Sequence, residues 1–379
     1  MRGGGCMKTS IYLIAITCSF ANLSSFHVDN DASGNFFRPP SPYHLPVYKF
    51  FKDKPLTCSH VQVVTEPLRL LQAAKDALHY FDIHQSGRDH IINPEGFRDI
   101  LSAYDVKKTL RFVIATIEAD KKTGNYRILD PAFIEENFGG IAWNADWQGA
   151  ARLAVKLPHD GQIRLTSYGI MTAKGSVKKT AQYPCGLYYL QDHSIQYSYT
   201  KQQILAGILE KQNNRNKRKA LAWVNRQDLE DALMHGTVLV SFSDGSKKIL
   251  NVDRHNGVPY QRANKNVLSQ KRYWFFREIK SSSKRGQQII QRFNNRKSVI
   301  FAGDLYNIGL GKLIAITHQN PQTKRKEMRL GILADTGGAF VNNLYQLDYF
   351  GGIFYSKQAM KNHLRTLPSF TRATILYKS

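Results

Sequence analysis

The sequence predicts a mainly β protein with helices in its N-terminal part, which is the α+β class. Apolar residues recur at helical spacing from Pro67 to Phe81, and residues 161–169 alternate as in a half-buried strand. Two later apolar runs, 298–309 and 331–338, break into glycine turns. With 379 residues and 42% apolar side chains, the chain is long enough for two domains or for one domain with a large insertion.

The first residues predict export from the cytoplasm. A short basic start precedes the apolar run 11–21, which is too short to span a bilayer and ends in small residues at the offsets of a cleavage site. We therefore expect a signal peptide over 1–21, secretion across the inner membrane to the periplasm, and an extended linker over 22–59. Cys18 leaves lipidation and outer-membrane association open, although the residues before it fit the lipoprotein pattern poorly.

Two cysteines, Cys58 and Cys185, remain after the leader. In an oxidising compartment they either pair as one disulfide or stay as two buried thiols. Neither is expected to be catalytic, because no histidine stands in a recognisable pairing motif with them.

The helical part is predicted over residues 67–81, 94–118 and 131–138. Between the first two helices the chain imitates the opening of a calcium-binding loop. It then places Asp89 where an apolar residue belongs and Asn93 where the bidentate glutamate belongs. We therefore predict a plain turn there, and neither a metal nor a cofactor for the protein, since no cluster of His, Cys and carboxylate residues suggests one.

Strands are expected to dominate from about residue 161 onward. Thr166, Tyr168 and Tyr188 lie in strand-like segments, and exposed side chains of these types would suit a glycan, because hydroxyls bond to sugars and aromatic faces stack on them. A buried strand aromatic is the alternative for Tyr168. Two further runs, 238–242 and 248–252, with tight glycine turns after them, predict a small β-barrel.

Three aspartates close apolar segments near the C-terminus: Asp304, Asp335 and Asp348. Gly337 and Gly338 follow the second of these, and paired glycines relax the backbone where a side chain would obstruct a ligand. Asp348 stands between apolar and aromatic neighbours, a setting that raises a carboxyl pKa and suits a general acid. An ordinary turn aspartate is the alternative for each of the three.

These segments resemble the three-aspartate C-terminal domain of the MltA-type membrane-bound lytic transglycosylases. Asp304 falls on that family's Ala-x-Asp motif, and Asp335 on its Asp-Thr-Gly-Gly-Ala motif. Asp348 falls on the aspartate that serves there as catalytic acid and base. Thr166 and Tyr168 match its Leu-Thr-Gly-Tyr-Tyr strand, which lines the sugar groove, and the resemblance runs in one order over roughly residues 60–379.

The resemblance implies a six-stranded double-psi β-barrel with an inserted second β-barrel and a substrate groove between the two. Ligand sites often lie at such domain interfaces. The expected division is a signal peptide over 1–21, a linker over 22–59, a discontinuous barrel domain over 60–171 and 271–379, and an inserted barrel over 172–270.

The activity that the resemblance implies is cleavage of the β-1,4 bond between N-acetylmuramic acid and N-acetylglucosamine in peptidoglycan, with formation of 1,6-anhydromuramoyl ends. Asp348 would act alone as general acid and base, while Asp304 and Asp335 fix turns or hydrogen-bond near it. Substitutions beside the expected groove, at 234–237 and 340–342, leave a second interpretation open. In it, the chain is a peptidoglycan-binding cell-wall protein that keeps the barrel without turnover.

The excess of basic over acidic residues indicates what kind of partner the protein binds. The chain holds 53 Lys+Arg against 29 Asp+Glu, a formal net charge of +24, which implies an anionic partner. Peptidoglycan glycan strands are the expected partner, with an anionic membrane surface as a further possibility and the monomer as the expected state. Nucleic acid is not expected, because the aromatic and basic interleaving of a known nucleic-acid module is missing.

Overall fold

The structure is a computed structural model that describes residues 18–19, 45–84, 89–189, 199–211, 220–261, 264, 266–279 and 287–379. Apart from Cys18–Ser19, the predicted signal peptide lies outside these residues, as does the linker up to residue 44. No helix in the described part of the chain is both long and apolar enough to cross a membrane. The molecule is mainly β with several helices, as the sequence predicts.

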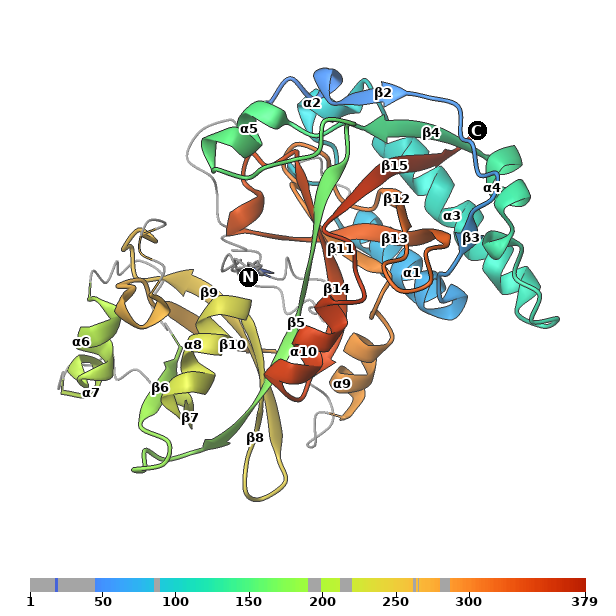
Figure 1. The fold of residues 1–379 in the computed structure, drawn as a ribbon. Coiled ribbons are helices and arrows are strands. Elements are labelled where there is room, and N and C mark those ends of the chain that lie inside the picture. The colour runs from blue at the N-terminus through green and yellow to red at the C-terminus, as the bar shows by residue number, and fades with distance from the viewer. Residues whose placement is uncertain are drawn as a thin grey trace, which may run out of the picture.

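Two long helices form most of the N-terminal part and lie side by side against the sheet (Figure 1). Helix α1 spans Pro67–Ile83 and begins with its proline in the first turn. Helix α3 spans Ala103–Asp120 and begins with a capping box, in which Ser102 and Asp105 satisfy each other's backbone N–H groups. The shorter elements here are η1 (Val47–Lys49), α2 (Glu95–Arg98), η2 (Arg127–Leu129), α4 (Pro131–Asn137) and α5 (Trp147–Arg152).

Six strands pair in a closed ring, in the order β5, β14, β11, β13, β12, β15 and back to β5. Their side chains fill what we call the first core, with Phe301, Leu330 and Ile375 fully buried in it. Closure leaves the ring without a free edge, which protects it from pairing with other chains. The strands are β5 (Ile163–Ser176), β11 (Ile300–Ala302), β12 (Leu313–Gln319), β13 (Lys326–Gly337), β14 (Gln346–Phe354) and β15 (Phe370–Lys378).

Shorter elements extend this ring. Strand β4 (Phe138–Trp143) pairs with β15, and β2 (Phe51–Asp53) pairs with β4. Two two-residue strands pair with β13, β3 (Gln62–Val63) near its start and β1 (Cys18–Ser19) at its end. The remaining elements are α9 (Gln287–Asn294), η4 (Gly338–Phe340) and α10 (Lys357–Leu364).

A second core of buried side chains lies in the middle of the chain and runs from Ala173 to Phe276. Around it the strands of the described residues pair as an open series, β6, β7, β5, β8, β9, β10. The sequence placed residues from 271 onward in the first domain, yet the aromatic side chains of β10 pack in the second core and β10 pairs with β9. The elements are β6 (Cys185–Tyr188), α6 (Lys201–Leu205), α7 (Ile208–Lys211), β7 (Ala220–Val224), α8 (Arg226–His235), β8 (Thr237–Ser241), β9 (Lys247–His255), η3 (Val267–Ser269) and β10 (Trp274–Ile279).

Strand β5 belongs to both cores and runs from one part of the molecule to the other (Figure 1). Its first half pairs in parallel with β14, from Arg164 to Met171. Its second half pairs in parallel with β8, from Met171 to Lys174, and its last two residues pair with β7. The same strand therefore carries residues of the first core and holds the second core in place.

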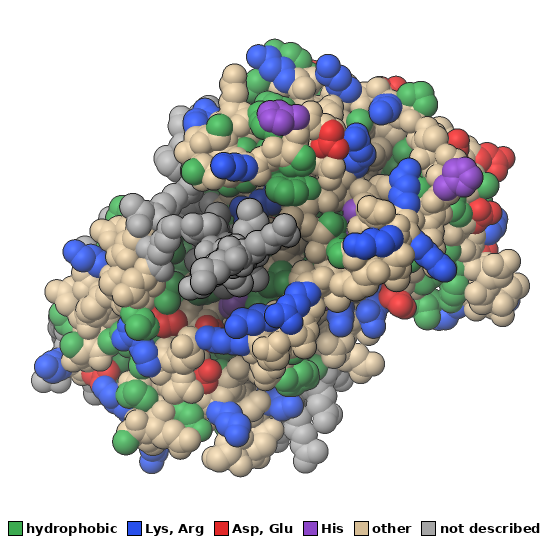
Figure 2. Space-filling model, viewed as in Figure 1, with side chains coloured by type: hydrophobic (Ala, Val, Ile, Leu, Met, Phe, Trp, Pro, Cys, Tyr) green, Lys and Arg blue, Asp and Glu red, His purple; other side chains and the backbone are tan. Residues whose placement is uncertain are grey.

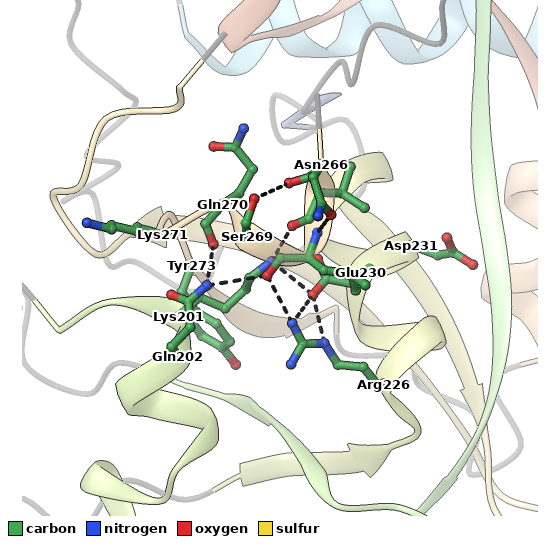
Figure 3. A network of polar contacts seen from close by, with 12 residues as sticks. Lys201, Gln202, Arg226, Glu230, Asp231, Asn266, Ser269, Gln270, Lys271 and Tyr273 are labelled. Atoms are coloured by element: carbon green, nitrogen blue, oxygen red, sulfur yellow. Dashed lines mark hydrogen bonds and ion pairs between the residues drawn. The ribbon is translucent and has the colours of Figure 1, made fainter. Parts of the chain in front are cut away.

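A buried ion pair ties the helices of the second part to the loop before β10 (Figure 3). The Nζ atom of Lys201 lies 2.9 and 2.7 Å from the two carboxylate oxygens of Glu230, and 2.7 Å from the carbonyl oxygen of Val267. The two side chains are 1% and 3% exposed. Arg226, one turn before Glu230 on α8, also donates to that carboxylate, at 2.9 Å. The Glu230 carboxylate is thus paired with positively charged side chains from two helices, α6 and α8.

Cys58 and Cys185 are free and buried, which is the second of the two states that the sequence allowed. Burial raises the pKa of both thiols, so little thiolate forms near neutral pH. We expect both to resist alkylation in native protein and to react in urea, as mass spectrometry of labelled peptides would show. A Cys185→Ser variant should keep its activity if it folds; its loss would contradict a purely structural role.

Candidate active site

Strand register brings two of the three aspartates to opposite sides of the same short strand. Ala302, the last residue of β11, aligns with Asp335 on β13 and with Asp348 on β14. Neighbouring strands lie about 4.8 Å apart, so the two aspartate backbones are separated by roughly 10 Å across β11. On the far side of β14, Thr166 of β5 aligns with Asp348. The pairing of these strands therefore brings Thr166, Asp335 and Asp348 into one region of the molecule.

Asp348 is fully buried, and its two oxygens have different surroundings. Oδ1 accepts a hydrogen bond from the Thr166 hydroxyl and another from the Gln346 amide at 2.9 Å. Oδ2 is buried and has no hydrogen-bond partner among the described residues. A buried carboxyl oxygen without a partner is costly in an ordinary core, and such groups in native structures often serve function.

The protonation of Asp348 follows from that burial. Loss of solvent raises its pKa to about 7, although the hydrogen bond from Gln346 and the charge of Arg164 act in the opposite direction. A large fraction of Asp348 is therefore neutral near pH 7. A neutral carboxyl can donate a proton, which an ordinary surface aspartate at this pH cannot do.

Asp335 is equally buried, but its carboxylate is occupied. The hydroxyl of Tyr168 donates to Oδ2 at 2.7 Å, and the backbone N–H of Thr336 donates to Oδ1 at 2.8 Å. Its carbonyl oxygen also accepts from the N–H of Gly303, at 3.0 Å. These contacts join β13 to β5 and to the turn after β11, which suits a structural or positioning residue.

Asp304 lies in the turn after β11 and organises that turn. Its carboxylate accepts from the backbone N–H and the side-chain amide of Asn307, at 3.2 and 2.7 Å, and from the N–H of Asn343 at 3.0 Å. Burial raises its pKa to about 6. The Asn343 contact ties this turn to the segment that leads into β14, so Asp304 supports the strand that carries Asp348.

We expect Asp304→Ala to lower the free energy of unfolding by about 3 kcal/mol, because the buried donors of Asn307 and Asn343 lose their acceptor. Urea unfolding at pH 4 measures this, because at pH 7 ionisation of the buried Asp304, whose pKa is raised, already lowers the stability of the wild type. The control is Asp130→Ala, which removes an exposed cap at the start of α4 and should cost about 1 kcal/mol. Turnover per folded molecule should change little in either variant; a complete loss in folded Asp304→Ala would give Asp304 a chemical role.

The two tyrosines differ from the exposed residues that the sequence suggested. Tyr168 is 3% exposed and packs against Phe350, with ring centroids 5.2 Å apart. Tyr188 is 2% exposed and lies in the second core, where its hydroxyl donates to Glu210 at 2.7 Å. Alternation along a strand does not say which face is buried, and both rings turned inward. Neither ring face is free to stack on a sugar in this conformation.

Glycine is required at Gly351 and Gly352, and not at the expected pair, Gly337 and Gly338. Gly337 has an extended backbone with φ of −165°, which any residue can adopt, and Gly338 opens the short helix η4. Gly352 in β14 has φ of +95°, in the left-handed region that favours glycine. A side chain at Gly351 would meet His363 at 2.7 Å. This pair lies where β14 shifts its register against β5, just beyond Asp348.

The prediction from the sequence did not include Gln346, which contacts the candidate acid. Gln346 precedes Asp348 by two positions, so both side chains point to the same face of β14. The signal was present in the alternation of the strand, but a single glutamine there has no motif of its own. Its contact with Asp348 and Thr166 depends on the pairing of strands about 180 residues apart.

The imitated calcium loop lies partly outside the described residues, at 85–88. Asp89, within it, accepts from the Tyr80 hydroxyl at 2.6 Å and from the N–H of Ile91 at 3.1 Å. These contacts are those of a turn between helices. Over the described residues, no group of three or more His, Cys, Asp or Glu is placed to hold a metal ion.

Lys and Arg side chains are spread over one face of the molecule. In Figure 2 these side chains lie over both parts of the molecule. This distribution agrees with the formal net charge of +24. A basic face concentrates anionic polymers near it, whatever their identity.

Known proteins resemble this chain in structure and not in sequence. No family model matches the sequence, and no curated protein matches it. A membrane-bound lytic murein transglycosylase from Agrobacterium tumefaciens has 14% identity and a TM-score of 0.54, over 83% of this chain and 93% of its own. E. coli MltA with bound chitohexaose has 13% identity and a TM-score of 0.55, over 89% of this chain and 96% of its own. The chain therefore has the fold of the MltA-type lytic murein transglycosylases.

Proposed function

We propose that this protein is a peptidoglycan lytic transglycosylase with Asp348 as its single general acid and base. The observation that carries the proposal is the asymmetric, fully buried carboxyl of Asp348, which has one oxygen held by two donors and the other without a partner among the described residues. The fold shared with lytic murein transglycosylases supports the same activity.

The proposed reaction needs two proton transfers through the same carboxyl group, one from Asp348 and one to it. Neutral Asp348 donates its proton to the glycosidic oxygen as the bond from C1 of N-acetylmuramic acid to that oxygen breaks. The hydroxyl on C6 of the same sugar then attacks C1, and the Asp348 carboxylate takes the hydroxyl proton. The products are a 1,6-anhydromuramoyl end and a free sugar hydroxyl, and Asp348 is neutral again. No water is consumed.

A single acid fits the surroundings of the other two aspartates. Hydrolytic glycosidases need two carboxyl groups with free oxygens, one for the proton and one for attack or for activating water. Asp335 and Asp304 use both of their carboxylate oxygens in hydrogen bonds to the protein. We therefore assign them to positioning, with Asp335 supporting the wall of the site and Asp304 the turn before β14.

The pKa of Asp348 sets the expected pH dependence. Only the neutral acid can donate, so kcat should fall as the pH rises through about 7. We expect roughly tenfold slower turnover at pH 8 than at pH 6, which initial rates on purified sacculi would measure. Flat rates between pH 5 and pH 9 would show that no group with this pKa donates the proton.

The proposed substrate is the glycan strand of peptidoglycan, bound in a groove between the two parts of the molecule. The basic side chains spread over both parts in Figure 2 support an anionic polymer as the partner. We further propose that the ring of six strands is the double-psi barrel and that the second core is the inserted barrel domain. Secretion to the periplasm completes the proposal, because peptidoglycan lies outside the inner membrane.

Digestion of purified sacculi tests the activity directly. Mass spectrometry should detect anhydro-muropeptides, which lack the elements of water relative to hydrolysis products. Reducing ends of ordinary mass would instead indicate a hydrolase. Retention of the protein on sacculi without released product would support the alternative of a peptidoglycan-binding protein without turnover, which the substitutions at 234–237 and 340–342 also motivate.

A further inference from the structure

The side chain of Gln346 is buried and makes two hydrogen bonds beside the candidate acid. Its side chain begins β14 beside the site and is 4% exposed. The amide nitrogen lies 2.9 Å from Oδ1 of Asp348 and 3.1 Å from the hydroxyl oxygen of Thr166. The Thr166 hydroxyl and Oδ1 are hydrogen-bonded to each other, so both lie on the same side of the amide nitrogen and share one of its hydrogens.

The resulting triangle fixes where the Asp348 proton can lie. Thr166 accepts from Gln346 and donates its own hydrogen to Oδ1 of Asp348. Oδ1 therefore receives two hydrogens and has no room for a third. The proton of the neutral acid must then lie on Oδ2, the oxygen without a partner among the described residues.

We propose that Gln346 is a positioning residue that, together with Thr166, holds the Asp348 carboxyl in one rotamer with its proton on Oδ2. The inference rests on the proposed function, since it assumes that Asp348 is the acid. Gln346 need not touch the substrate. Its task is to keep the donating oxygen aimed at the scissile bond and to prevent the carboxyl from flipping.

Charged and titratable groups on the strands beside Asp348 also act on its proton. Arg164 on β5 aligns with Gln346 and lowers the pKa of Asp348. On the β11 side, Asp335 is bonded to Tyr168 and Thr336, and Asp304 to Asn307 and Asn343. Hydrogen bonds to a carboxylate favour its charged form. Removing the Gln346 donor should therefore raise the pKa of Asp348, with Arg164 left in place.

The test is Gln346→Leu, with Gln270→Leu as the matched control. Gln270 is also buried, at 3% exposure, and its amide donates to the carbonyl oxygens of Gln261 and Asn264 in the second part of the molecule. In Gln346→Leu we expect kcat to fall roughly 10- to 100-fold, as for a misaligned reacting group. The alkaline limb of the pH–rate profile should move up by about one unit. Gln270→Leu should lose stability and keep the wild-type profile.

A second readout does not need activity. Carbon-13 NMR of labelled carboxyl groups follows the titration of Asp348, whose signal is identified by its absence in Asp348→Asn. The midpoint should rise in Gln346→Leu and stay constant in Gln270→Leu. If Gln346→Leu does not fold, Thr166→Val removes the other donor at nearly constant volume and should move the midpoint in the same direction.

An unchanged midpoint and an unchanged pH profile in folded Gln346→Leu would overturn the inference, because a merely structural glutamine predicts that result. Its failure is distinguishable from failure of the proposed function. If Asp348→Asn is inactive while Gln346→Leu behaves like the control, only the positioning role is wrong. If Asp348→Asn keeps full turnover, the acid is another group and the role of Gln346 falls with it.

Discussion

Asp348→Asn is expected to lower the release of anhydro-muropeptides by roughly 10²- to 10⁴-fold, which is the usual contribution of a general acid. The amide has nearly the shape of the carboxyl and can still accept from Gln346 and Thr166 through its oxygen. It cannot deliver a proton to the leaving oxygen. Asp335 and Asp304 do not replace it, because their carboxylate oxygens are engaged by other groups of the described residues. Quantitative digestion of sacculi measures the effect.

The stability of the same variant provides an independent check. Burial raises the pKa of Asp348 from 3.8 to about 7, so the wild type loses stability as the pH rises through this window, because Asp348 ionises in the unfolded chain while it stays neutral in the folded one. At about 1.4 kcal/mol per unit, the full loss by pH 8 is roughly 4 kcal/mol. Asparagine does not ionise, so the variant should be more stable than the wild type at pH 8. Its unpartnered amide nitrogen reduces this gain.

Urea unfolding at pH 8 and pH 5 separates the two effects, because the advantage of Asp348→Asn should shrink as the pH falls toward 4. Binding to sacculi should be largely unchanged. If the folded variant turned over at nearly the wild-type rate, Asp348 would not be the acid, and Asp335 would become the next candidate.

Glu230→Leu is expected to cost about 3–5 kcal/mol of the free energy of unfolding, because it strands a buried ammonium. Lys201 is 1% exposed, and apart from Glu230 its Nζ atom contacts the carbonyl oxygen of Val267 at 2.7 Å. Burial already lowers the pKa of Lys201, against the effect of Glu230, so the lone lysine should lose its proton more readily still. Chemical denaturation at pH 7 measures the cost.

The double variant Lys201→Met with Glu230→Leu should recover most of that stability, since an apolar pair of similar volume needs no solvation. The matched control is Glu278→Gln, which breaks an ion pair to Lys248 whose side chains are 37% and 33% exposed. That change should cost less than about 1 kcal/mol. A double variant as unstable as Glu230→Leu would mean that the pair contributes through its contacts to the neighbouring loop and not through charge compensation.

The sequence predicted the elements of the site better than the contacts between them. Asp304, Asp335 and Asp348 end apolar runs, a local pattern, and all three are indeed buried at or beside strands of one ring. Tyr168 shows where such patterns stop being informative, because alternation distinguishes the two faces of a strand but does not say which face packs against the core. Gln346 shows it again, since its role arises only from the register of β14 against β5.

The boundary of the second part shows a limit of another kind. The aromatic run of β10 has the composition of any buried strand, and nothing local says which of two cores it joins. Its pairing with β9 decides the matter, with Phe276 opposite Val252. Long-range pairing of this sort is set by the whole fold and cannot be derived from one segment.

Strand β5 also has a mechanical consequence. At Met171 its backbone is paired with β14 on one side and with β8 on the other, so the junction between the two parts is a continuous piece of sheet. A flexible hinge normally absorbs its motion in a few loop residues. Here, swinging one part away from the other would shear ladder hydrogen bonds on both sides of a single strand. The two parts should consequently hold their spacing, so that the proposed glycan would lose little ordering entropy in the protein when it binds between them.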